Sequence, residues 1–303
     1  MNLIKHLNKI YDAKNKPFLI YQNTELKFSD IINEQQINLD IVNPGDVVAL
    51  IGDFNASSIS TLLRLIDLKT IIVPLTIDTK NMHKYFFESA LVDVVIKDGK
   101  TKYLNHNNTH KLIENLRKKS HAGLILFSTG TTGRPKAILH DMTLFLERFQ
   151  TPRPTLKIIN FLLFDHIGGI NTLLHTIFNS GVVVAPIDRD VDSILKICAK
   201  YKVEVLPTTP TFLRLMLLSG SVPSKIPNCI KIITYGTERM DQSTLDELCK
   251  FLPNIDFRQT YGMSELGIVR VKSKARNSLY MKIGGEGVET KIDNKVLKIR
   301  SKT

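Results

Sequence analysis

Cysteine is scarce in this sequence, and long hydrophobic runs are missing. The 303 residues include three cysteines, Cys198, Cys229 and Cys249, with no CxxC pair and no spacing typical of a metal site. An odd number of separated cysteines argues against a disulfide framework and favours reduced, buried thiols in the cytoplasm. The longest apolar stretches, such as 161–164, are too short to cross a bilayer. Residues 1–16 lack the apolar segment of a signal peptide, so we expect a cytoplasmic chain without a membrane span.

The charge of the chain is basic, with a formal net charge of +12 and a pI near 9.5. Lys and Arg are nevertheless scattered along the whole sequence, and their densest cluster is the short run 117–119. Because there is no basic arm and no basic tract interleaved with aromatic residues, we do not expect nucleic-acid binding as the main function. A positive field of this kind attracts phosphorylated ligands.

Short β-branched runs alternate with segments of helical periodicity over most of the chain. The predicted strands are 47–51, 70–75, 92–96, 123–127, 137–140, 157–164, 182–186, 203–207 and 230–235. The predicted helices are 56–68, 81–90, 142–149, 170–178, 191–199, 211–218 and a helix capped by Asp241 that runs to Phe251. This alternation, with short connections, predicts an α/β protein with two doubly wound parallel-sheet lobes.

The remaining segments suggest how the chain is divided. Residues 267–301 look like short antiparallel strands, and a polar stretch at 97–111 separates the two α/β blocks. We therefore expect a first α/β lobe at 1–120, a second lobe at 121–267 and the start of a small antiparallel β element at 268–303.

A hydroxyl-rich loop follows the predicted strand 123–127, in the sequence STGTTGRPK. In doubly wound sheets, ligands bind beyond the carboxyl ends of the strands, which is where this loop would lie. Glycines let the backbone approach an anion closely, while hydroxyls, backbone N–H groups and a lysine supply donors and positive charge. The alternative is a solvated turn. The expected anion-binding residues are Ser128, Thr129, Gly130, Thr131, Thr132, Gly133 and Lys136.

The loop is not a Walker P-loop. Pro135 stands where that motif requires its second glycine, and Ala137 stands where it requires a magnesium-binding hydroxyl. The following segment, 137–140, also resembles a strand, whereas the Walker motif opens a helix.

Three further segments carry residues suited to nucleotide chemistry. In YGMSE, Tyr261 offers a flat ring and Gly262 permits close approach, while Ser264 offers a hydroxyl and Glu265 a hard oxygen ligand for Mg²⁺. TYGTERM, at 234–240, is predicted to be a turn at the end of a strand. FDHIGG, at 164–169, places Asp165 and His166 before a double glycine. Each is weak alone, because exposed glutamates are usually solvated and a lone histidine is more often a packed core residue.

Taken in this order, STGTTGRPK, FDHIGG, TYGTERM and YGMSE resemble the adenylate-forming superfamily, which includes acyl-CoA synthetases, aryl-CoA ligases, luciferases and the adenylation domains of peptide synthetases. The resemblance extends over nearly the whole chain. It implies a two-step reaction in which a carboxylate attacks the α-phosphorus of ATP and a thiol then takes the acyl group. The thiol would belong to coenzyme A or to the phosphopantetheine of an acyl carrier protein.

The resemblance also implies roles for individual residues. Residues 128–136 would hold the β- and γ-phosphates, and Lys136, His166 and Glu265 would be the catalytic residues. The adenine would be contacted by Gly236, Thr237, Glu238 and Tyr261, with Gly262 beside Tyr261. Ser264 would approach the α-phosphate, and Glu265 would bind Mg²⁺. His166 would lie beside the acyl pocket.

The sequence departs from the family pattern in ways that leave alternatives open. A Thr-Gly-Asp segment and a C-terminal domain with a catalytic lysine, both usual in the family, do not follow residue 300. We therefore expect the large N-terminal domain of an acyl-activating enzyme, slow or inactive alone. One alternative is a catalytically silent nucleotide- or acyl-binding module. Another is an amino-acid-activating domain, because Asp165 could hold a substrate amino group; a plain small-molecule carboxylic acid is favoured over it.

Overall fold

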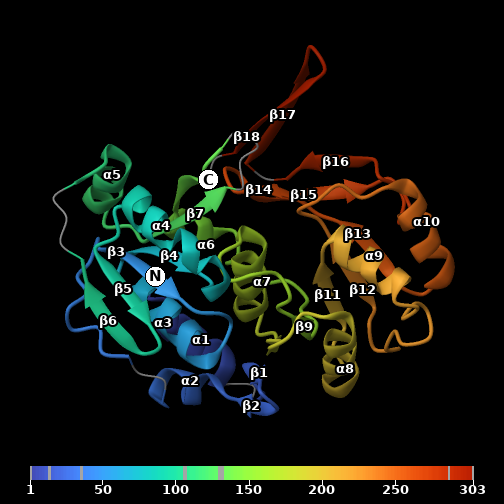
Figure 1. Ribbon diagram of the computed structural model, residues 1–303, viewed down its shortest axis with the longest axis horizontal. Helices are drawn as coiled ribbons and strands as arrows, with labels where there is room; N and C mark the ends of the chain where they lie inside the picture. The colour runs from blue at the N-terminus through green and yellow to red at the C-terminus, as the bar shows by residue number, and fades with distance from the viewer. Residues whose placement is uncertain are drawn as a thin grey trace.

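The computed structural model describes residues 2–12, 15–34, 37–104, 108–128, 133–285 and 287–301. Within these residues the chain forms a six-stranded and a seven-stranded sheet flanked by helices, followed by two small antiparallel sheets (Figure 1). The predicted α/β class, with two doubly wound lobes and an antiparallel tail, is confirmed. In the described part of the chain, no helix is both long enough and apolar enough to cross a membrane.

The first sheet has the order β6-β5-β3-β4-β7-β8, with four parallel central strands and an antiparallel strand at each edge. Its strands are β3 (Val47–Ile51), β4 (Ile71–Leu75), β5 (Val94–Lys97), β6 (Lys100–Tyr103), β7 (Gly123–Ser128) and β8 (Lys136–Asp141). One face packs on α3 (Ala56–Asp67), which Asn55 caps. The other face packs on α4 (His83–Ala90), preceded by the 3-10 turn η1 (Ile77–Met82), and on α5 (Lys111–Lys119).

The second sheet has the order β13-β12-β11-β9-β10-β1-β2, and all of its strands except β2 are parallel. Its strands are β1 (Leu19–Tyr21), β2 (Thr24–Leu26), β9 (Ile158–Ile159), β10 (Val183–Val184), β11 (Val205–Thr208), β12 (Ile232–Tyr235) and β13 (Asp256–Gln259). The helices that cover its outer face are α8 (Val191–Tyr201), α9 (Pro210–Leu218) and α10 (Gln242–Phe251). Asp241 caps α10 by accepting from the Thr244 N–H, as predicted.

A shared core joins the two sheets. Helix α7 (Ile167–Phe178) lies between them (Figure 1), and its apolar residues belong to one buried cluster with residues of both sheets. That cluster includes Leu50 and Leu124 from the first sheet and Leu19 and Val183 from the second, all at most 2 % exposed. Besides α3 and α7, the helices in it are α1 (Leu3–Asp12), α2 (Phe28–Glu34) and α6 (Met142–Glu147).

The boundary between the sheets does not coincide with the predicted division at residues 120 and 121. Strands β7 and β8, expected to open the second lobe, belong to the first sheet, where Ile71 and Ile72 of β4 pair with Gly123 and Leu124. Strands β1 and β2, expected in the first lobe, belong to the second sheet. The sequence pattern predicts a strand from its own residues, but the neighbour of each strand is determined by packing elsewhere in the chain.

Two predicted strands are much shorter than expected. The apolar run 157–164 forms only the two-residue strand β9, and 182–186 forms only β10. Residues 161–164 leave the sheet and become the connection to α7, where Phe164 is fully buried. The apolar character of Phe161 and Phe164 therefore reflects burial in a connection and not strand pairing, whereas Leu163 is exposed.

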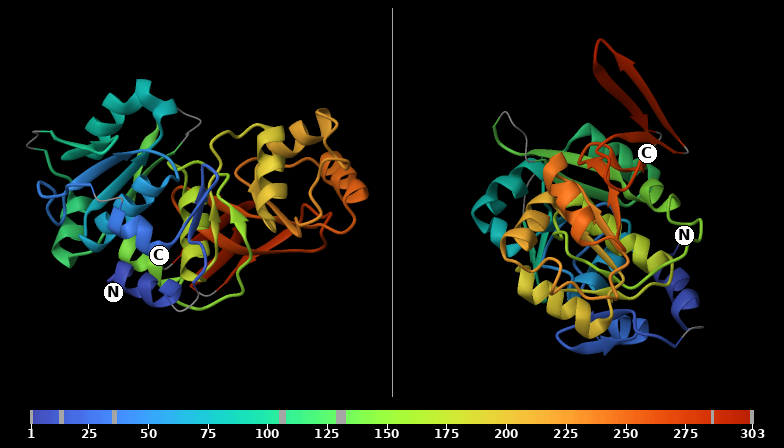
Figure 2. Two further views of the ribbon diagram at one scale, coloured as in Figure 1. Left: turned by 90° about the horizontal axis from the view of Figure 1, so that it is seen from below. Right: turned by 90° about the vertical axis from the view of Figure 1, so that its right-hand side faces the viewer.

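The tail forms two antiparallel units. Strands β14 (Tyr261–Met263), β15 (Gly267–Ser273) and β16 (Met281–Gly284) make a small sheet. Strands β17 (Val288–Asp293) and β18 (Val296–Ser301) make a hairpin that projects from the body (Figure 2). Its two-residue turn is at Asn294 and Lys295, both with positive φ.

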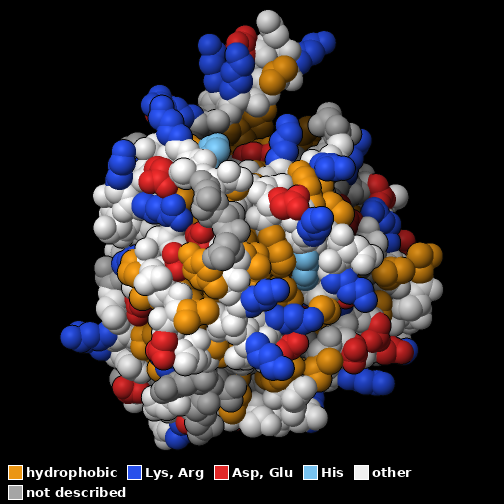
Figure 3. Space-filling view, turned by 60° about the vertical axis from the view of Figure 1, so that its left-hand side comes forward, with side chains coloured by type: hydrophobic (Ala, Val, Ile, Leu, Met, Phe, Trp, Pro, Cys, Tyr) orange, Lys and Arg blue, Asp and Glu red, His pale blue; other side chains and the backbone are white. Residues whose placement is uncertain are grey.

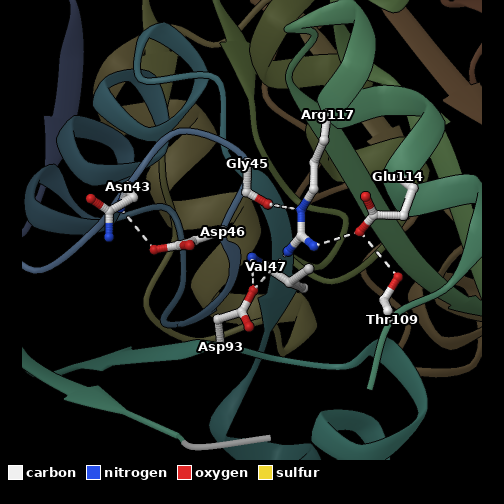
Figure 4. Close-up of polar contacts among 8 residues, drawn as sticks. All are labelled: Asn43, Gly45, Asp46, Val47, Asp93, Thr109, Glu114 and Arg117. Carbon is white, nitrogen blue, oxygen red and sulfur yellow. Dashed lines mark hydrogen bonds and ion pairs between the residues drawn. The ribbon is translucent and has the colours of Figure 1, made fainter. Parts of the chain in front are cut away.

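A polar network fixes α5 to the amino end of β3 (Figure 4). The Arg117 guanidinium donates to the Gly45 carbonyl at 2.9 Å, to Glu114 at 2.9 Å and to the Asp93 carboxylate at 3.2 Å. The same Asp93 oxygen accepts from the Val47 N–H at 2.8 Å. These contacts stabilise the amino edge of the first sheet, opposite the edge that carries the predicted phosphate loop.

Candidate functional site

The predicted phosphate loop connects the paired ends of β7 and β8. Ser128 and Lys136 are cross-strand partners, and the Lys136 N–H donates to the Ser128 hydroxyl at 3.4 Å. Gly133 has a φ of +140°, a conformation that favours glycine. The Lys136 side chain is exposed, and no hydrogen bond or ion pair joins its ammonium to a described residue. Thr129, Gly130, Thr131 and Thr132 lie outside the described residues.

Helix α4 supports the end of this loop. The Tyr85 hydroxyl donates to the Pro135 carbonyl at 2.7 Å, and the Arg134 guanidinium lies 5.5 Å from the centre of the Tyr85 ring. These contacts hold the chain just before Lys136. They place two cationic side chains at the carboxyl edge of the first sheet, where an anion would be attracted.

The turn after β12 carries the predicted adenine contacts. A Cβ added to Gly236 would lie 2.1 Å from the Thr260 hydroxyl, so only glycine allows this close approach. Thr237 has a φ of +68°, which is uncommon for a residue with a side chain and occurs often at functional sites. Glu238 accepts from the Thr211 N–H at 3.1 Å and from its hydroxyl at 2.5 Å, so the turn is tied to the start of α9.

A pocket of about 340 Å³ brings two of the predicted motifs together. Its walls combine apolar side chains with a few polar ones at the carboxyl edge of the second sheet. The lining residues are Phe161, Leu162, Leu163, His166, Arg189, Thr209, Thr211, Phe212, Leu215, Thr237 and Glu238. His166 from FDHIGG thus meets Thr237 and Glu238 from TYGTERM. Lys136, Tyr261, Ser264 and Glu265 are not among the described lining residues.

His166 is held as a neutral imidazole at the start of α7. Its Nδ1 accepts from the Gly168 N–H at 3.1 Å, so in the neutral ring the proton is on Nε2. Burial lowers the pKa of His166, and the neighbouring Asp165 partly offsets this by raising it. The Nε2–H group is therefore a donor of the kind that could contact a carboxylate oxygen.

Asp165 forms a contact between the two lobes. Its carboxylate accepts from the Thr76 hydroxyl, beyond the end of β4, at 3.0 Å. Burial raises the pKa of Asp165, while the Thr76 hydrogen bond lowers it. The cap of the following helix α7 is His166 and not Asp165.

Arg189 is a pocket residue that the sequence did not reveal. Its guanidinium donates to the Phe161 carbonyl and to the Asp53 carboxylate, both at 2.9 Å, so it joins the pocket wall to the loop after β3. The sequence feature that could have indicated Arg189 is its position shortly after the predicted strand 182–186, since ligands bind at the carboxyl edge of parallel sheets.

The predicted magnesium ligand lies in the turn between β14 and β15. Glu265 is exposed, and its carboxylate makes no hydrogen bond or ion pair with the residues described. Gly262 lies close to the opposite strand, since an added Cβ would be 2.9 Å from the Gly267 carbonyl. Within the described ranges, no three potential ligands from His, Cys, Asp and Glu gather around one point. A single free carboxylate fits Mg²⁺, which binds proteins through one or two carboxylates and keeps waters or phosphate oxygens as its other ligands.

His140 of β8 contacts this turn, and Arg148, which follows α6, contacts the start of β15. The imidazole of His140 lies 2.5 Å from the Ser264 carbonyl, and Arg148 donates to the Ile268 carbonyl at 3.2 Å. Burial lowers the pKa of His140 and Arg148 adds to this, whereas the Ser264 contact and Glu265 raise it. Neither residue was expected at the site.

A model of the family described as "AMP-binding enzyme" matches residues 42–296. Among curated proteins, the 4-coumarate–CoA ligase 4 of Arabidopsis thaliana is 26% identical over 185 residues, which are 57% of this chain and 32% of that protein. Acyl-CoA synthetase 7 of Caenorhabditis elegans is 26% identical over 179 residues, which are 52% of this chain and 33% of that protein. The chain thus spans about a third of the length of these relatives.

Solved structures share the fold. The N-terminal subdomain of Klebsiella oxytoca NpsA, in complex with anthranilyl-AMSN, has a TM-score of 0.79 at 14% identity and covers 98% of this chain and 86% of that one. The o-succinylbenzoate CoA synthetase of Bacillus subtilis, in complex with its acyl-adenylate intermediate, has a TM-score of 0.67 at 14% identity and covers 98% of this chain and 77% of that one.

Proposed function

Because the chain belongs to the family of AMP-binding enzymes, we propose that it activates a small carboxylic acid with ATP and passes the acyl group to a thiol. In the first step the carboxylate oxygen forms a bond to the α-phosphorus, and the bond to pyrophosphate breaks. In the second step a thiolate attacks the acyl carbon, and AMP leaves. The thiol donor is coenzyme A or the phosphopantetheine of a carrier protein, and the reaction takes place in the cytoplasm.

The observation that carries the proposal is the meeting of His166 with Thr237 and Glu238 around one pocket. These residues come from motifs about 70 positions apart, both of which the family pattern assigns to the acyl-adenylate site. A neutral histidine donor beside an apolar cavity suits an acid whose carboxylate must be oriented and whose body must be kept from water.

The phosphates of ATP are assigned to the loop 128–136, with Lys136 supplying charge. Gly236, Thr237 and Glu238 would lie along the adenine, Tyr261 and Gly262 would flank it, and Ser264 would approach the α-phosphate. Glu265 would hold Mg²⁺, which when bound neutralises charge that develops on the phosphate oxygens. The scattered Lys and Arg side chains on the face shown in Figure 3 would add a positive field for such anions.

The structure favours a plain carboxylic acid over an amino acid. An Asp that held a substrate amino group would need to face the pocket with a free oxygen. Asp165 instead accepts from Thr76 of the other lobe and is not among the described lining residues. The described pocket wall is largely apolar, and the guanidinium of its Arg189 is paired with Asp53. An acid with an uncharged, apolar body fits this pocket best.

A catalytically silent nucleotide- or acyl-binding module remains the second candidate. It is favoured by one observation, that Lys136, Ser264 and Glu265 are not among the described residues that line the pocket of His166. Under either candidate this chain alone would bind nucleotide. We propose that as an enzyme it is weakly active by itself.

The test is calorimetric titration of the chain with ATP, with and without Mg²⁺. We expect Lys136→Ala to weaken binding in both conditions, and Glu265→Gln to remove only the gain from Mg²⁺. Lys102→Ala, on the opposite edge of the first sheet, and Glu247→Gln, on α10, are matched exposed controls that should bind like the wild type.

Two results would contradict the assignment. A folded wild-type chain that binds no ATP at millimolar concentration would overturn the nucleotide site. Equal losses in the Lys136 variant and its control would overturn the assignment of the phosphate loop.

A further inference from the structure

The two halves of the proposed nucleotide site belong to different sheets. Lys136 is on β8 of the first sheet, whereas Ser264 and Glu265 follow β13 and β14 in the second lobe. No backbone pairing joins β8 to β14 or β15. The distance between the lysine and the glutamate must therefore be fixed by side-chain contacts.

His140 makes such a contact from the same strand as Lys136. Positions 136, 138 and 140 of β8 lie on one face of the sheet, and four residues of a strand span about 13 Å. A carbonyl oxygen only accepts, so the hydrogen bond of 2.5 Å runs from His140 Nε2–H to the Ser264 carbonyl. One imidazole therefore joins the strand of the phosphate loop to the residue next to Glu265.

A second contact reaches the other side of the same turn. Arg148, at the end of α6, donates to the Ile268 carbonyl and lies over the Phe145 ring at 4.3 Å. Gly267, between the two contact points, has a φ of +72°. The turn 264–266 is thus held on both sides by the segment that begins with Lys136.

We propose that His140 is a positioning residue that fixes the turn carrying Ser264 and Glu265 relative to Lys136. This inference rests on the proposed function. Since Mg²⁺ would join Glu265 to phosphates held by the loop, the contribution of the ion depends on how well the turn is placed. A shift of about 1 Å in a positioned group can cost two orders of magnitude in rate.

The experiment measures the gain in ATP affinity that Mg²⁺ produces, in the full chain by calorimetry. We expect His140→Leu to reduce that gain about three- to tenfold, the range of one net hydrogen bond, and to leave Mg²⁺-free affinity unchanged. His140→Gln, which retains an N–H donor, should keep most of the gain. The control is His175→Leu on α7. It removes another partly buried histidine, whose side chain hydrogen-bonds to Asn179 and not to the turn.

A second readout needs no nucleotide. Hydrogen exchange of the amides of residues 264–267 should be faster in His140→Leu than in the wild type, and unchanged in His140→Gln. If His140→Leu does not fold, His140→Asn, whose shorter amide does not reach the carbonyl, takes its place with the same expectations.

The outcomes separate the two claims. A wild-type chain without any Mg²⁺ gain overturns the assignment of Glu265, and this inference falls with it. A wild-type gain that is fully retained in His140→Leu overturns the positioning role alone. Equal losses of affinity with and without Mg²⁺ would also overturn it, because they indicate a general structural effect.

Discussion

Replacing Gly236 by alanine tests whether the turn after β12 depends on a close approach of two chains. The new Cβ would lie 2.1 Å from the Thr260 hydroxyl and 2.9 Å from the Thr260 carbonyl, and neither distance is tolerable for a carbon atom. The Thr260 hydroxyl donates to the Tyr235 carbonyl at 3.1 Å, and its N–H donates to the same oxygen at 2.7 Å. Relief therefore requires Thr260 to rotate away from Tyr235 or the strand ends to separate.

The loss in the free energy of unfolding can be approximated from these two changes, the rotation of Thr260 and the separation of the strand ends. Losing the hydroxyl bond costs about 1 kcal/mol, and forcing extra atoms into a packed site costs about 1–3 kcal/mol. We expect Gly236→Ala to lower the free energy of unfolding by about 2–4 kcal/mol in total. Urea unfolding followed by circular dichroism measures this directly.

Gly284→Ala provides the control, because a Cβ there meets no atom within 4 Å and φ is not positive. That change should be neutral or stabilising by up to about 1 kcal/mol. In a Thr260→Ala background, the cost of Gly236→Ala should fall, and a double-mutant cycle would show the coupling. An unchanged urea midpoint for Gly236→Ala would refute the reasoning that this glycine is required for space.

Two further predictions concern stability. Arg117→Ala removes the contacts that the guanidinium makes with Gly45, Asp93 and Glu114 in Figure 4, and should destabilise the chain by about 1–3 kcal/mol. Lys118→Ala on the same helix is the exposed control, and ATP affinity should be unchanged in both variants. Burial raises the pKa of Asp165, so the carboxyl group keeps its proton to a higher pH in the folded chain than in the unfolded chain. The free energy of unfolding therefore falls as the pH rises from the unfolded pKa of Asp165 through its folded pKa. Asp165→Asn should therefore raise the urea midpoint at neutral pH, and this gain should disappear at about pH 4. A difference in midpoint between the variant and the wild type that does not change with pH would contradict this.

Much of the fold could be predicted from local patterns. The strands β3 and β4 are buried on both faces and read as continuous apolar runs, and α3 shows helical periodicity between them. The cap of α10 by Asp241 follows from the residue type and its place before an apolar segment. Each of these features is encoded within a dozen residues, which is why the α/β class could be predicted.

Features that depend on distant residues could not be predicted. Nothing in 123–141 indicates that β7 pairs with β4 and so belongs to the first sheet. For the candidate site, the four motifs could be identified in the sequence because each contains a cluster of glycines, hydroxyls or charged residues. Arg189 and His140 stand alone in their segments, and their importance comes from partners 136 and 124 positions away.

The path of the chain between the sheets has a consequence for dissecting this protein. Since β1 and β2 complete the second sheet, a fragment that starts at residue 121 would leave β10 as an uncovered edge with unpaired N–H and C=O groups. It would also expose the side of α7 that packs on α1. Open strand edges recruit strands from other molecules. Cutting the chain between its apparent halves should therefore yield pieces that aggregate, and the pieces should recover the native fold only when they are refolded together.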